Sequence, residues 1–198
     1  MIEFINLSDE EPYTLFKKNY HKAKNAGQKN IEAIVISSFN KEIKEVDSRF
    51  VNLKIIDNNK FIFFTNYNSP KAIAFNSFEQ ISALFYWPSI NTQIRMKAII
   101  NKTSKNFNNE YFKKRNKEKN ALAISSDQSK PSISYDEIVS KYENTKKTKN
   151  LLKCPDYWGG FLFLPYCFEF WEGHDSRVNK RVIFNKTDLD WERSFLEP

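Results

Sequence analysis

The sequence has few of the residues that proteins use for covalent or metal cross-links. Only two Cys and two His occur among its 198 residues. Cys154 and Cys167 cannot form a disulfide framework, and the isolated His21 and His174 cannot build a histidine metal site. Four Gly and seven Pro exclude collagen-like and linker-dominated architectures. We therefore expect a folded chain in a reducing compartment, with no structural metal.

Long hydrophobic runs are also absent. The longest apolar run, 161–168, is interrupted by Pro165 and is much shorter than the ~20 residues that span a bilayer. The first residues, M-I-E-F-I-N-L-S-D-E-E, are acidic, whereas a secretion signal begins with basic residues. The sequence therefore predicts a cytoplasmic protein without a membrane partner.

Aromatic residues and positive charge are abundant by contrast. Phe, Tyr and Trp make up 16% of the chain, and its formal net charge is +7. Aromatic rings favour strands and stacking sites. The charge favours anionic partners, which are nucleic acid, an anionic membrane surface or phosphorylated small molecules. A nucleic-acid binder is one alternative, but no recognised binding motif supports it, and we expect no nucleic acid partner.

Hydrophobic periodicity predicts a chain dominated by β-structure. The predicted strands cover 31–38, 48–57, 60–66, 80–87, 92–102, 158–171 and 180–185. The predicted helices cover 12–26, 70–77, 107–121 and 134–149. This order predicts a mainly β (α+β) fold, a closed or nearly closed antiparallel barrel with peripheral helices. We expect one domain over 1–198, with a helical segment at 1–30 and the barrel with its helices at 31–198.

The segment from Thr65 to Lys71 joins a predicted strand to a predicted helix. Ser69 stands at the cap position and Pro70 at the first helical position, which are common signals of a helix start. Free backbone N–H groups, the helix dipole, two hydroxyls and the Lys71 ammonium would together make a phosphate cradle. Plain helix capping is the alternative interpretation.

Tyr111, Arg115 and Lys119 are spaced four residues apart. A helix over 107–121 would place them along one stripe, where a phenol, a guanidinium and an ammonium suit a phosphate dianion. An exposed lysine-rich face is the alternative interpretation of the same pattern.

Two further segments contain basic residues at informative spacings. Arg49 and Lys54 share a predicted strand at an odd separation, so strict alternation would put them on opposite faces. Either a bulge intervenes, or one residue acts by its side chain and the other through its backbone. In E-F-W-E-G-H-D-S-R-V-N-K-R, Trp171, Arg177 and Arg181 flank a polar loop between two strands. A core Trp with solvated Arg residues is as good an interpretation of this segment as a binding site.

Taken in order, these segments resemble the pyridoxamine 5′-phosphate oxidase family, flavoproteins of the FMN-binding split β-barrel superfamily. The resemblance extends from about Glu32 to Pro198. It is carried by nine colinear motifs: S-R-F-V-N-L-K (48–54), F-F-T-N-Y-N-S-P-K (63–71), F-Y-W (85–87), N-T-Q-I-R (91–95), Y-F-K-K-R (111–115), D-Q-S (127–129), W-G-G (158–160), E-F-W-E-G (169–173) and the terminal D-W-E-R-S-F-L-E-P. No single motif is decisive, but their colinear order is strong support.

The resemblance implies a homodimer that holds one FMN in each of two clefts between the subunits. The FMN contacts that it implies are Arg49, Phe50, Val51, Asn52, Leu53, Lys54, Phe64, Thr65, Lys71, Gln93, Gln128, Ser129, Trp171 and Arg181. The substrate would be a small phosphorylated vitamin B6 compound. Its implied contacts are Lys54, Tyr111, Arg115, Lys119, Arg177 and Asn179, with Arg177 over the substrate ring as the catalytic residue.

The activity that the resemblance implies is oxidation of pyridoxamine or pyridoxine 5′-phosphate to pyridoxal 5′-phosphate. A hydride passes from the exocyclic carbon of the substrate to the flavin, and molecular oxygen then reoxidises the flavin and gives hydrogen peroxide. The protein contributes placement, because two phosphate anchors hold the two ring systems face to face. No side-chain nucleophile and no metal are required.

Four positions depart from the family pattern. Pro70 replaces an Arg beside the cofactor phosphate, Lys119 replaces a Ser of the substrate helix, Asn179 replaces a His of the substrate loop, and Phe195 replaces the Arg of the terminal R-L-A-P. FMN binding tolerates these changes, but three of them fall on or beside the substrate side. Two alternatives therefore stay open: a diverged flavoprotein oxidase with another substrate, as in phenazine biosynthesis, and a protein that holds FMN or pyridoxal phosphate without turnover.

Overall fold

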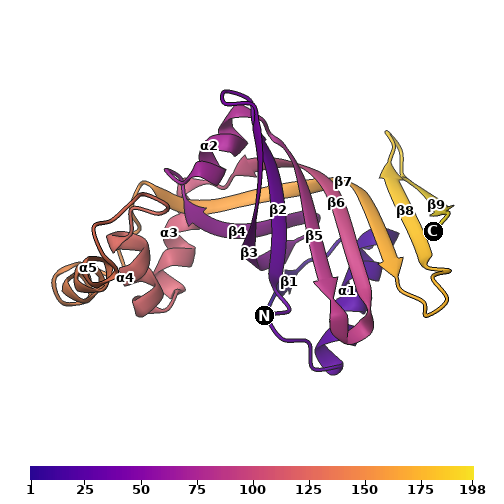
Figure 1. The fold of residues 1–198 in the computed structure, drawn as a ribbon, viewed down its shortest axis with the longest axis horizontal. Helices are drawn as coiled ribbons and strands as arrows, with labels where there is room; N and C mark the ends of the chain where they lie inside the picture. Colours follow the sequence, from indigo (N-terminus) through magenta and orange to yellow (C-terminus); the bar gives the residue numbers. More distant parts are fainter.

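The computed structural model describes all residues from 1 to 198 (Figure 1). The strands are β1 (Glu3–Ile5), β2 (Ala33–Asn40), β3 (Glu45–Asp57), β4 (Lys60–Asn66), β5 (Gln80–Trp87), β6 (Thr92–Lys102), β7 (Trp158–Glu172), β8 (Lys180–Lys186) and β9 (Trp191–Leu196). The helices are α1 (Glu11–Asn25), α2 (Pro70–Ser77), the 3₁₀ turn η1 (Pro88–Ile90), α3 (Lys105–Lys114), α4 (Lys117–Ser125) and α5 (Tyr135–Thr148). The predicted elements are present within a few residues, except that one predicted helix is divided. Strands β1 and β9 were not predicted.

Six of the strands close into a barrel. β3 pairs with β2, β2 with β5, β5 with β6, β6 with β7, β7 with β4, and β4 pairs again with β3. All six pairings are antiparallel. Closure removes the free edges that an open sheet of six strands would have. The prediction of an antiparallel barrel with peripheral helices is therefore confirmed.

Aromatic side chains fill the barrel and seal one of its openings. Phe61 and Phe163, on the neighbouring strands β4 and β7, are fully buried and stack with ring centroids 5.1 Å apart. Helix α1 contributes Phe16, which meets Phe61 edge-on at 5.3 Å, and Tyr13, which meets Phe168 edge-on at 5.2 Å. Inward-facing strand positions fill a small barrel with side chains, and here rings occupy much of that space.

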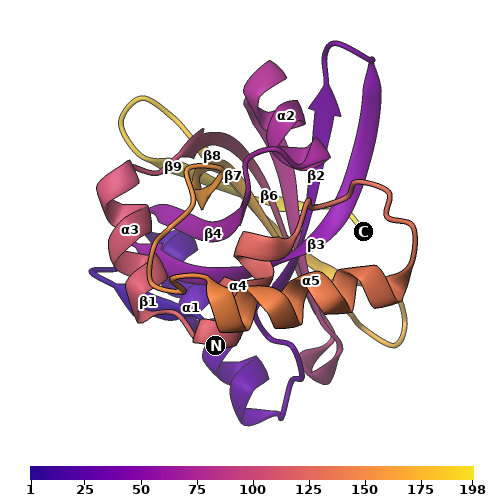
Figure 2. The ribbon, with the colours of Figure 1, turned by 90° about the vertical axis from the view of Figure 1, so that its left-hand side faces the viewer.

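Two groups of elements lie on opposite sides of the barrel. Helices α3, α4 and α5 form a helical lobe on one side, and the β8–β9 hairpin extends the sheet from β7 on the other side (Figure 1). Seen from the helical lobe, α5 lies in front and packs against α4 (Figure 2). None of the helices combines the length and the apolar composition that crossing a bilayer requires.

The prediction of one helix over 107–121 is wrong, because the chain turns in the middle of this segment. Arg115 follows α3 with an extended backbone (φ −74°, ψ 151°). Asn116 then caps α4, and its side chain accepts hydrogen bonds from two N–H groups of the first turn. A capping residue has a non-helical backbone, so the two helices cannot be continuous. The predicted stripe of Tyr111, Arg115 and Lys119 on a single helix therefore does not exist.

Candidate functional site

A cavity of about 680 Å³ opens between the barrel and the helical lobe. Its lining residues are Asp47, Arg49, Phe50, Val51, Asn52, Lys54, Phe64, Thr65, Pro70, Lys71, Tyr111, Arg115, Asn116, Lys119, Gln128 and Ser129. Five of these side chains are cationic and one is a carboxylate. The volume lies within the usual range for small-molecule and cofactor sites, and the excess of positive charge favours an anionic ligand.

A bulge in β3 brings Arg49 and Lys54 to the same cavity. The pairing of β3 with β4 shifts its register between Leu53 and Ile55. Because the shift interrupts strict alternation, both basic side chains line the cavity despite their odd spacing. Leu53 does not line the cavity, although its neighbours Asn52 and Lys54 do. Its side chain is fully buried in the core and its N–H donates to the Glu32 carbonyl at 2.9 Å.

Lys71, in the first turn of α2, has no carboxylate partner. The residue is only 8% exposed, and the single hydrogen bond of its Nζ atom is a 3.5 Å contact with Thr65 Oγ1. Burial, together with the positive charge of Arg49, lowers the pKa of Lys71. Burying an ammonium without a counter-charge is costly. This end of the cavity is therefore suited to an anion that a ligand supplies.

The surroundings of Lys71 differ in one respect from the predicted cradle. Ser69 is fully buried, and its hydroxyl donates to the Asn66 carbonyl at 2.7 Å instead of capping α2. The Thr65 hydroxyl, which donates to Gln128 Oε1 at 3.1 Å, lines the cavity. The cradle thus has one hydroxyl and not two. The same hydrogen bond holds the loop before α5 against the end of β4.

Arg49 is held firmly at the rim of the same cradle. Its Nη1 donates to Ser38 Oγ at 2.8 Å and to the Ile36 carbonyl at 3.1 Å, and its Nη2 pairs with Asp47. The hydrogen bond from Arg49 lowers the pKa of the Asp47 carboxyl. One carboxylate therefore offsets Arg49, which leaves the positive charge of Lys71 for a ligand.

A second group of cations lies at the other end of the cavity. Lys54, Arg115 and Lys119 come from β3, the α3–α4 junction and α4, and Tyr111 lies beside them on α3. The nearest carboxylate, that of Glu32, is 3.7 Å from Lys54 Nζ. Burial lowers the pKa of Lys54, and the charges of Lys119 and Arg115 lower it further. Tyr111, Arg115 and Lys119 are thus brought together by the turn between two helices.

The Arg115 guanidinium is oriented by two residues that sequence reasoning missed. Its Nη1 donates to Asn120 Oδ1 at 3.0 Å, and its Cζ atom lies over the Trp158 ring, 5.1 Å from the ring centroid. Asn120 is fully buried, and its amide donates to the Phe112 carbonyl at 2.8 Å and to the Leu151 carbonyl at 2.9 Å. A lone buried Asn has no sequence signal, whereas Trp158 opens the W-G-G motif.

An aromatic wall made of Phe64, Tyr111 and Trp158 borders this end of the cavity. The rings of Phe64 and Tyr111 are 3.7 Å apart and within 11° of parallel. Phe64 and Trp158 are 5.2 Å apart and within 8° of parallel. Stacked rings make a flat and rigid surface, so the second cation group is presented on a fixed support.

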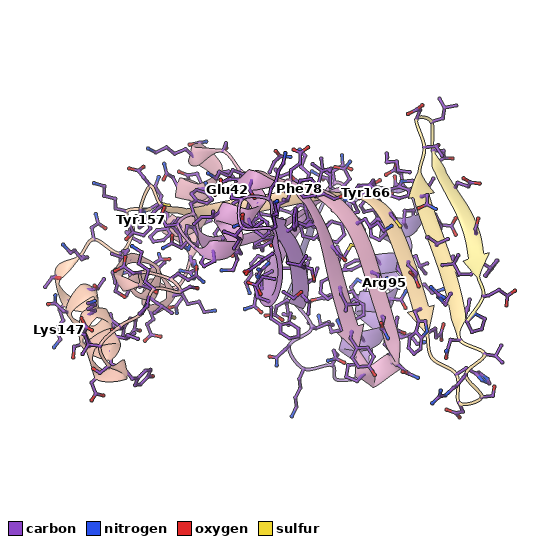
Figure 3. The ribbon with its side chains drawn as sticks, turned by 45° about the horizontal axis from the view of Figure 1, so that its top comes forward. Glu42, Phe78, Arg95, Lys147, Tyr157 and Tyr166 are labelled. Atoms are coloured by element: carbon purple, nitrogen blue, oxygen red, sulfur yellow. The ribbon has the colours of Figure 1, made fainter.

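Several of the predicted site residues do not line this cavity. Gln93 on β6 is paired in register with Trp171 on β7, and Trp171 is paired with Arg181 on β8. The three residues therefore form a row across neighbouring strands. In the same part of β6, Arg95 lies on the hairpin side of the barrel, away from Lys147 in the helical lobe (Figure 3).

Arg177 and Asn179 lie in the exposed loop between β7 and β8, also outside the cavity. Arg177 has a left-handed backbone with φ 62°. The Asn179 side chain accepts a hydrogen bond from the His174 N–H at 3.0 Å, so it stabilises the loop from within. Within one chain, the predicted site residues therefore lie in separate places. Most line the basic cavity, whereas Gln93, Trp171 and Arg181 lie on neighbouring strands in what we call the β6–β8 surface.

A family model and several known proteins are similar to this chain. Residues 158–198 match the family model described as the pyridoxine 5′-phosphate oxidase C-terminal dimerisation region. A pyridoxine/pyridoxamine 5′-phosphate oxidase of Leptospira biflexa is 32% identical over 190 residues, which are 95% of this chain and 89% of that protein. The protein of the same name from Christiangramia forsetii is 36% identical over 195 residues, which are 96% of this chain and 89% of that protein.

Solved structures share the fold. PhzG from Burkholderia lata, determined in complex with tetrahydrophenazine-1-carboxylic acid, superposes with a TM-score of 0.90 at 22% identity and covers 96% of this chain and 93% of its own. A pyridoxamine 5′-phosphate oxidase-related, FMN-binding protein from Nostoc punctiforme gives a TM-score of 0.76 at 12% identity and covers 93% of this chain and 96% of its own. The fold is therefore that of a split barrel.

Proposed function

This chain belongs to the pyridoxamine 5′-phosphate oxidase family, and from that membership we propose that it is an FMN-dependent oxidase of pyridoxamine or pyridoxine 5′-phosphate. Its products would be pyridoxal 5′-phosphate and hydrogen peroxide, with molecular oxygen as the acceptor. One observation supports this proposal above others. A single cavity contains two separate groups of cations, around Lys71 and around Arg115, and in each group the positive charges outnumber the protein carboxylates that pair with them.

The cradle at the start of α2 fits the phosphate of FMN. Lys71 offers a buried ammonium without a carboxylate partner, Thr65 offers a hydroxyl, and the first turn of α2 contributes the positive end of its dipole. When bound, FMN supplies the capacity to accept a hydride and to be reoxidised by oxygen. Arg49 and Gln128 would border the cofactor, since both line the cavity beside Lys71.

The second cation group fits the phosphate of the substrate. Arg115 is pre-oriented by Asn120 and Trp158, so little side-chain entropy is lost when it binds an anion. Lys54 and Lys119 add two ammonium groups at the same end of the cavity. A ligand anchored there by its phosphate would have its ring held between this group and the cofactor, and such fixed placement is the main contribution of the protein to catalysis.

We also propose that a second copy of the chain completes each cavity. The predicted contacts Gln93, Trp171 and Arg181 lie together on the β6–β8 surface, outside the cavity of their own chain. The strands β7 to β9 that carry most of this surface fall within residues 158–198, the segment matched by the dimerisation model. In a homodimer, this surface of one copy would face the basic cavity of the other, with Arg177 over the substrate.

A second candidate function is oxidation of a different anionic substrate within the same fold. The close superposition with PhzG, whose complex holds a phenazine carboxylic acid, favours it. Lys119, which stands where the family pattern has Ser, gives this end of the cavity an additional positive charge. Such a group would bind a carboxylate as well as a phosphate. A flavoprotein without turnover would bind FMN and leave it oxidised in the presence of either substrate.

The test begins with the purified protein loaded with FMN and mixed with pyridoxamine 5′-phosphate in air. We expect pyridoxal 5′-phosphate and hydrogen peroxide to form together, measured by absorbance and by a coupled peroxide assay. Failure to take up FMN would contradict the proposal. A flavin that stays oxidised with this substrate in the absence of air would favour the second candidate function or a protein without turnover.

Arg115→Ala tests the substrate site directly. It should weaken the binding of the phosphorylated substrate by about tenfold or more, because a charge-assisted anchor is lost, and should scarcely change that of the dephosphorylated form. Lys113→Ala is the matched control, since Lys113 lies two residues before Arg115, at the end of α3, and pairs with Glu110 in solvent. Equal effects of Arg115→Ala on both substrates would remove Arg115 from the phosphate site.

A further inference from the structure

A buried carboxylate lies within the β6–β8 surface and contacts two arginines. Glu169 on β7 is 8% exposed. Its Oε1 accepts hydrogen bonds from Arg181 Nε at 3.0 Å and from Arg181 Nη2 at 2.8 Å. Its Oε2 pairs with Arg95 Nη1 at 3.0 Å. Arg95 lies on the hairpin side of the barrel (Figure 3). Neither the comparisons nor the sequence motifs assign a role to this carboxylate.

The strand register explains how these groups meet. Glu169 is directly opposite Arg95 on β6, whereas Trp171, two residues later on β7, is directly opposite Arg181 on β8. Residues two apart share one face of a strand, so Glu169 and Trp171 project to the same side. Arg181 must therefore reach diagonally past Trp171 to contact Glu169. Its guanidinium is drawn along the sheet and not left free to extend into solvent.

Arg181 is also fixed from a third direction. Its Nη1 donates to the backbone carbonyl of Glu197 at 2.7 Å, one residue before the C-terminus. An arginine has many rotamers and loses appreciable entropy when it is ordered. The contacts with Glu169 and Glu197 impose that order before any ligand arrives. Without the carboxylate, the positive charges of Arg95 and Arg181 would face each other across the sheet and repel.

We propose that Glu169 is a positioning residue, which holds the Arg181 guanidinium beside Trp171 in the orientation that contacts FMN. The proposal rests on the proposed function, because it takes FMN as the ligand of Arg181. Glu169 itself would not touch the cofactor. Its effect on FMN binding must therefore pass through Arg181, and this requirement separates a positioning role from a general structural one.

The experiment measures the dissociation constant for FMN by quenching of flavin fluorescence on titration with FMN-free protein. Glu169→Asp keeps the charge but shortens the side chain, so the hydrogen bonds to Arg181 lengthen. We expect FMN to bind about tenfold more weakly, since hydrogen bonds between charged groups are lost. Glu172→Asp is the matched control on the same strand, because Glu172 is exposed and pairs only with Lys22 at 3.7 Å. It should bind FMN within about twofold of the parent chain.

The decisive comparison repeats Glu169→Asp in the Arg181→Ala background. If Glu169 acts through Arg181, the substitution should then change FMN affinity by less than about twofold. An equal loss of affinity in both backgrounds overturns the proposal, as does a Glu169→Asp variant that binds FMN like the parent chain. If Glu169→Asp does not fold, as judged by its thermal unfolding, Glu169→Gln replaces it in the same comparison of the two backgrounds. Glutamine keeps the length of the side chain and one acceptor oxygen. A parent chain that cannot bind FMN at all would overturn the proposed function as well.

Discussion

At the scale of single residues, the chain keeps cations in places that stability alone would not favour. Lys71 is buried with one long hydrogen bond, and the guanidinium of the half-buried Arg115 has an amide as its only hydrogen-bond partner. Glu169, equally buried, is instead neutralised from two sides. Under the proposed function, Lys71 and Arg115 would receive their counter-charges from the phosphates of bound ligands. The sequence predicted both residues as anion-binding residues. Only the tertiary structure shows that no carboxylate pairs with either side chain.

Lys71→Met should separate stability from binding. Removing an unpaired buried ammonium in favour of an apolar side chain of similar length should raise the free energy of unfolding of the FMN-free protein by about 1 kcal/mol. The same change should weaken FMN binding by at least about tenfold, because a charge-assisted contact with the phosphate is lost. Denaturant unfolding and flavin titration measure the two effects. Lys147→Met, at an exposed site on α5, is the control and should change neither. A less stable variant with unchanged FMN affinity would contradict the role given to Lys71.

Lys54 should give substrate binding a dependence on alkaline pH. Its pKa is lowered from the ordinary 10.5 by burial and by the charges of Lys119 and Arg115. Raising the pH removes the ammonium proton, so attraction to a phosphate is present at neutral pH and is lost as the pH rises through this lowered pKa. We expect kcat/KM for the phosphorylated substrate, which reports the free enzyme, to fall at a lower pH than an ordinary lysine would dictate. Lys54→Gln should lower kcat/KM at neutral pH and remove that part of the profile. A parent profile identical to that of the variant would exclude Lys54.

At the scale of elements, the W-G-G motif fixes α3 on the barrel. The Gly160 N–H donates to Asn108 Oδ1 at 2.8 Å, and Asn108 Nδ2 donates to the Tyr67 hydroxyl at 3.0 Å. A Cβ atom on Gly159 would overlap both Tyr67 and Asn108, so the close approach of helix and strand requires glycine there. Because α3 ends beside Arg115, this contact sets the position of the substrate end of the cavity.

Gly159→Ala should therefore affect stability and binding together. Overpacking of this kind costs about 1–3 kcal/mol, and relief of the overlap would shift α3 with Tyr111 and Arg115. We expect a lower melting temperature and a higher KM for the phosphorylated substrate. Gly27→Ala is the control, because Gly27 has a positive φ but open space around its α-carbon. It should lower stability by about 1 kcal/mol through backbone strain and leave KM unchanged. A parallel rise of KM in both variants would show that general destabilisation, and not the α3 contact, is responsible.

At the scale of the whole molecule, the residues of the proposed site are divided between two sides. The basic cavity is lined in part by residues of α3 and α4, whereas Gln93, Trp171 and Arg181 form a row on β6, β7 and β8. The helical lobe and the β8–β9 hairpin lie on opposite sides of the barrel (Figure 1). The row does not line the cavity of its own chain. Two copies related by a two-fold axis would bring each cavity against the other copy's β6–β8 surface, because such an interface presents the same patches twice.

Hybrid dimers test this division. A dimer of one Lys71→Met copy and one Arg181→Ala copy has one cavity with both substitutions and one with neither. Co-expression of the two variants should therefore restore about a quarter of all sites to parental FMN affinity when subunits assort at random. Flavin titration of the co-expressed protein, compared with each variant alone, measures this recovery. No recovery in dimers of confirmed hybrid composition would show that each site is built from a single copy.

The sequence by itself determined the barrel class, most element bounds and the residue types of an anion site. The alternation of apolar and polar residues, the helix starts and the turn residues are local signals, and the charge of a side chain follows from its residue type. These features can therefore be read from the sequence. Tertiary structure alone decided that the chain turns at Asn116, that a bulge brings Arg49 and Lys54 together, and that Ser69 is turned away from the cradle. The Asn116 cap and the Ser69 hydrogen bond are local, but several local partners compete for such side chains. The bulge and the position of Arg115 depend on contacts between segments far apart along the chain, such as Asn120 with Leu151. No local pattern encodes the energy of such contacts, and for that reason the roles of Asn120 and Glu169 emerged only from the fold.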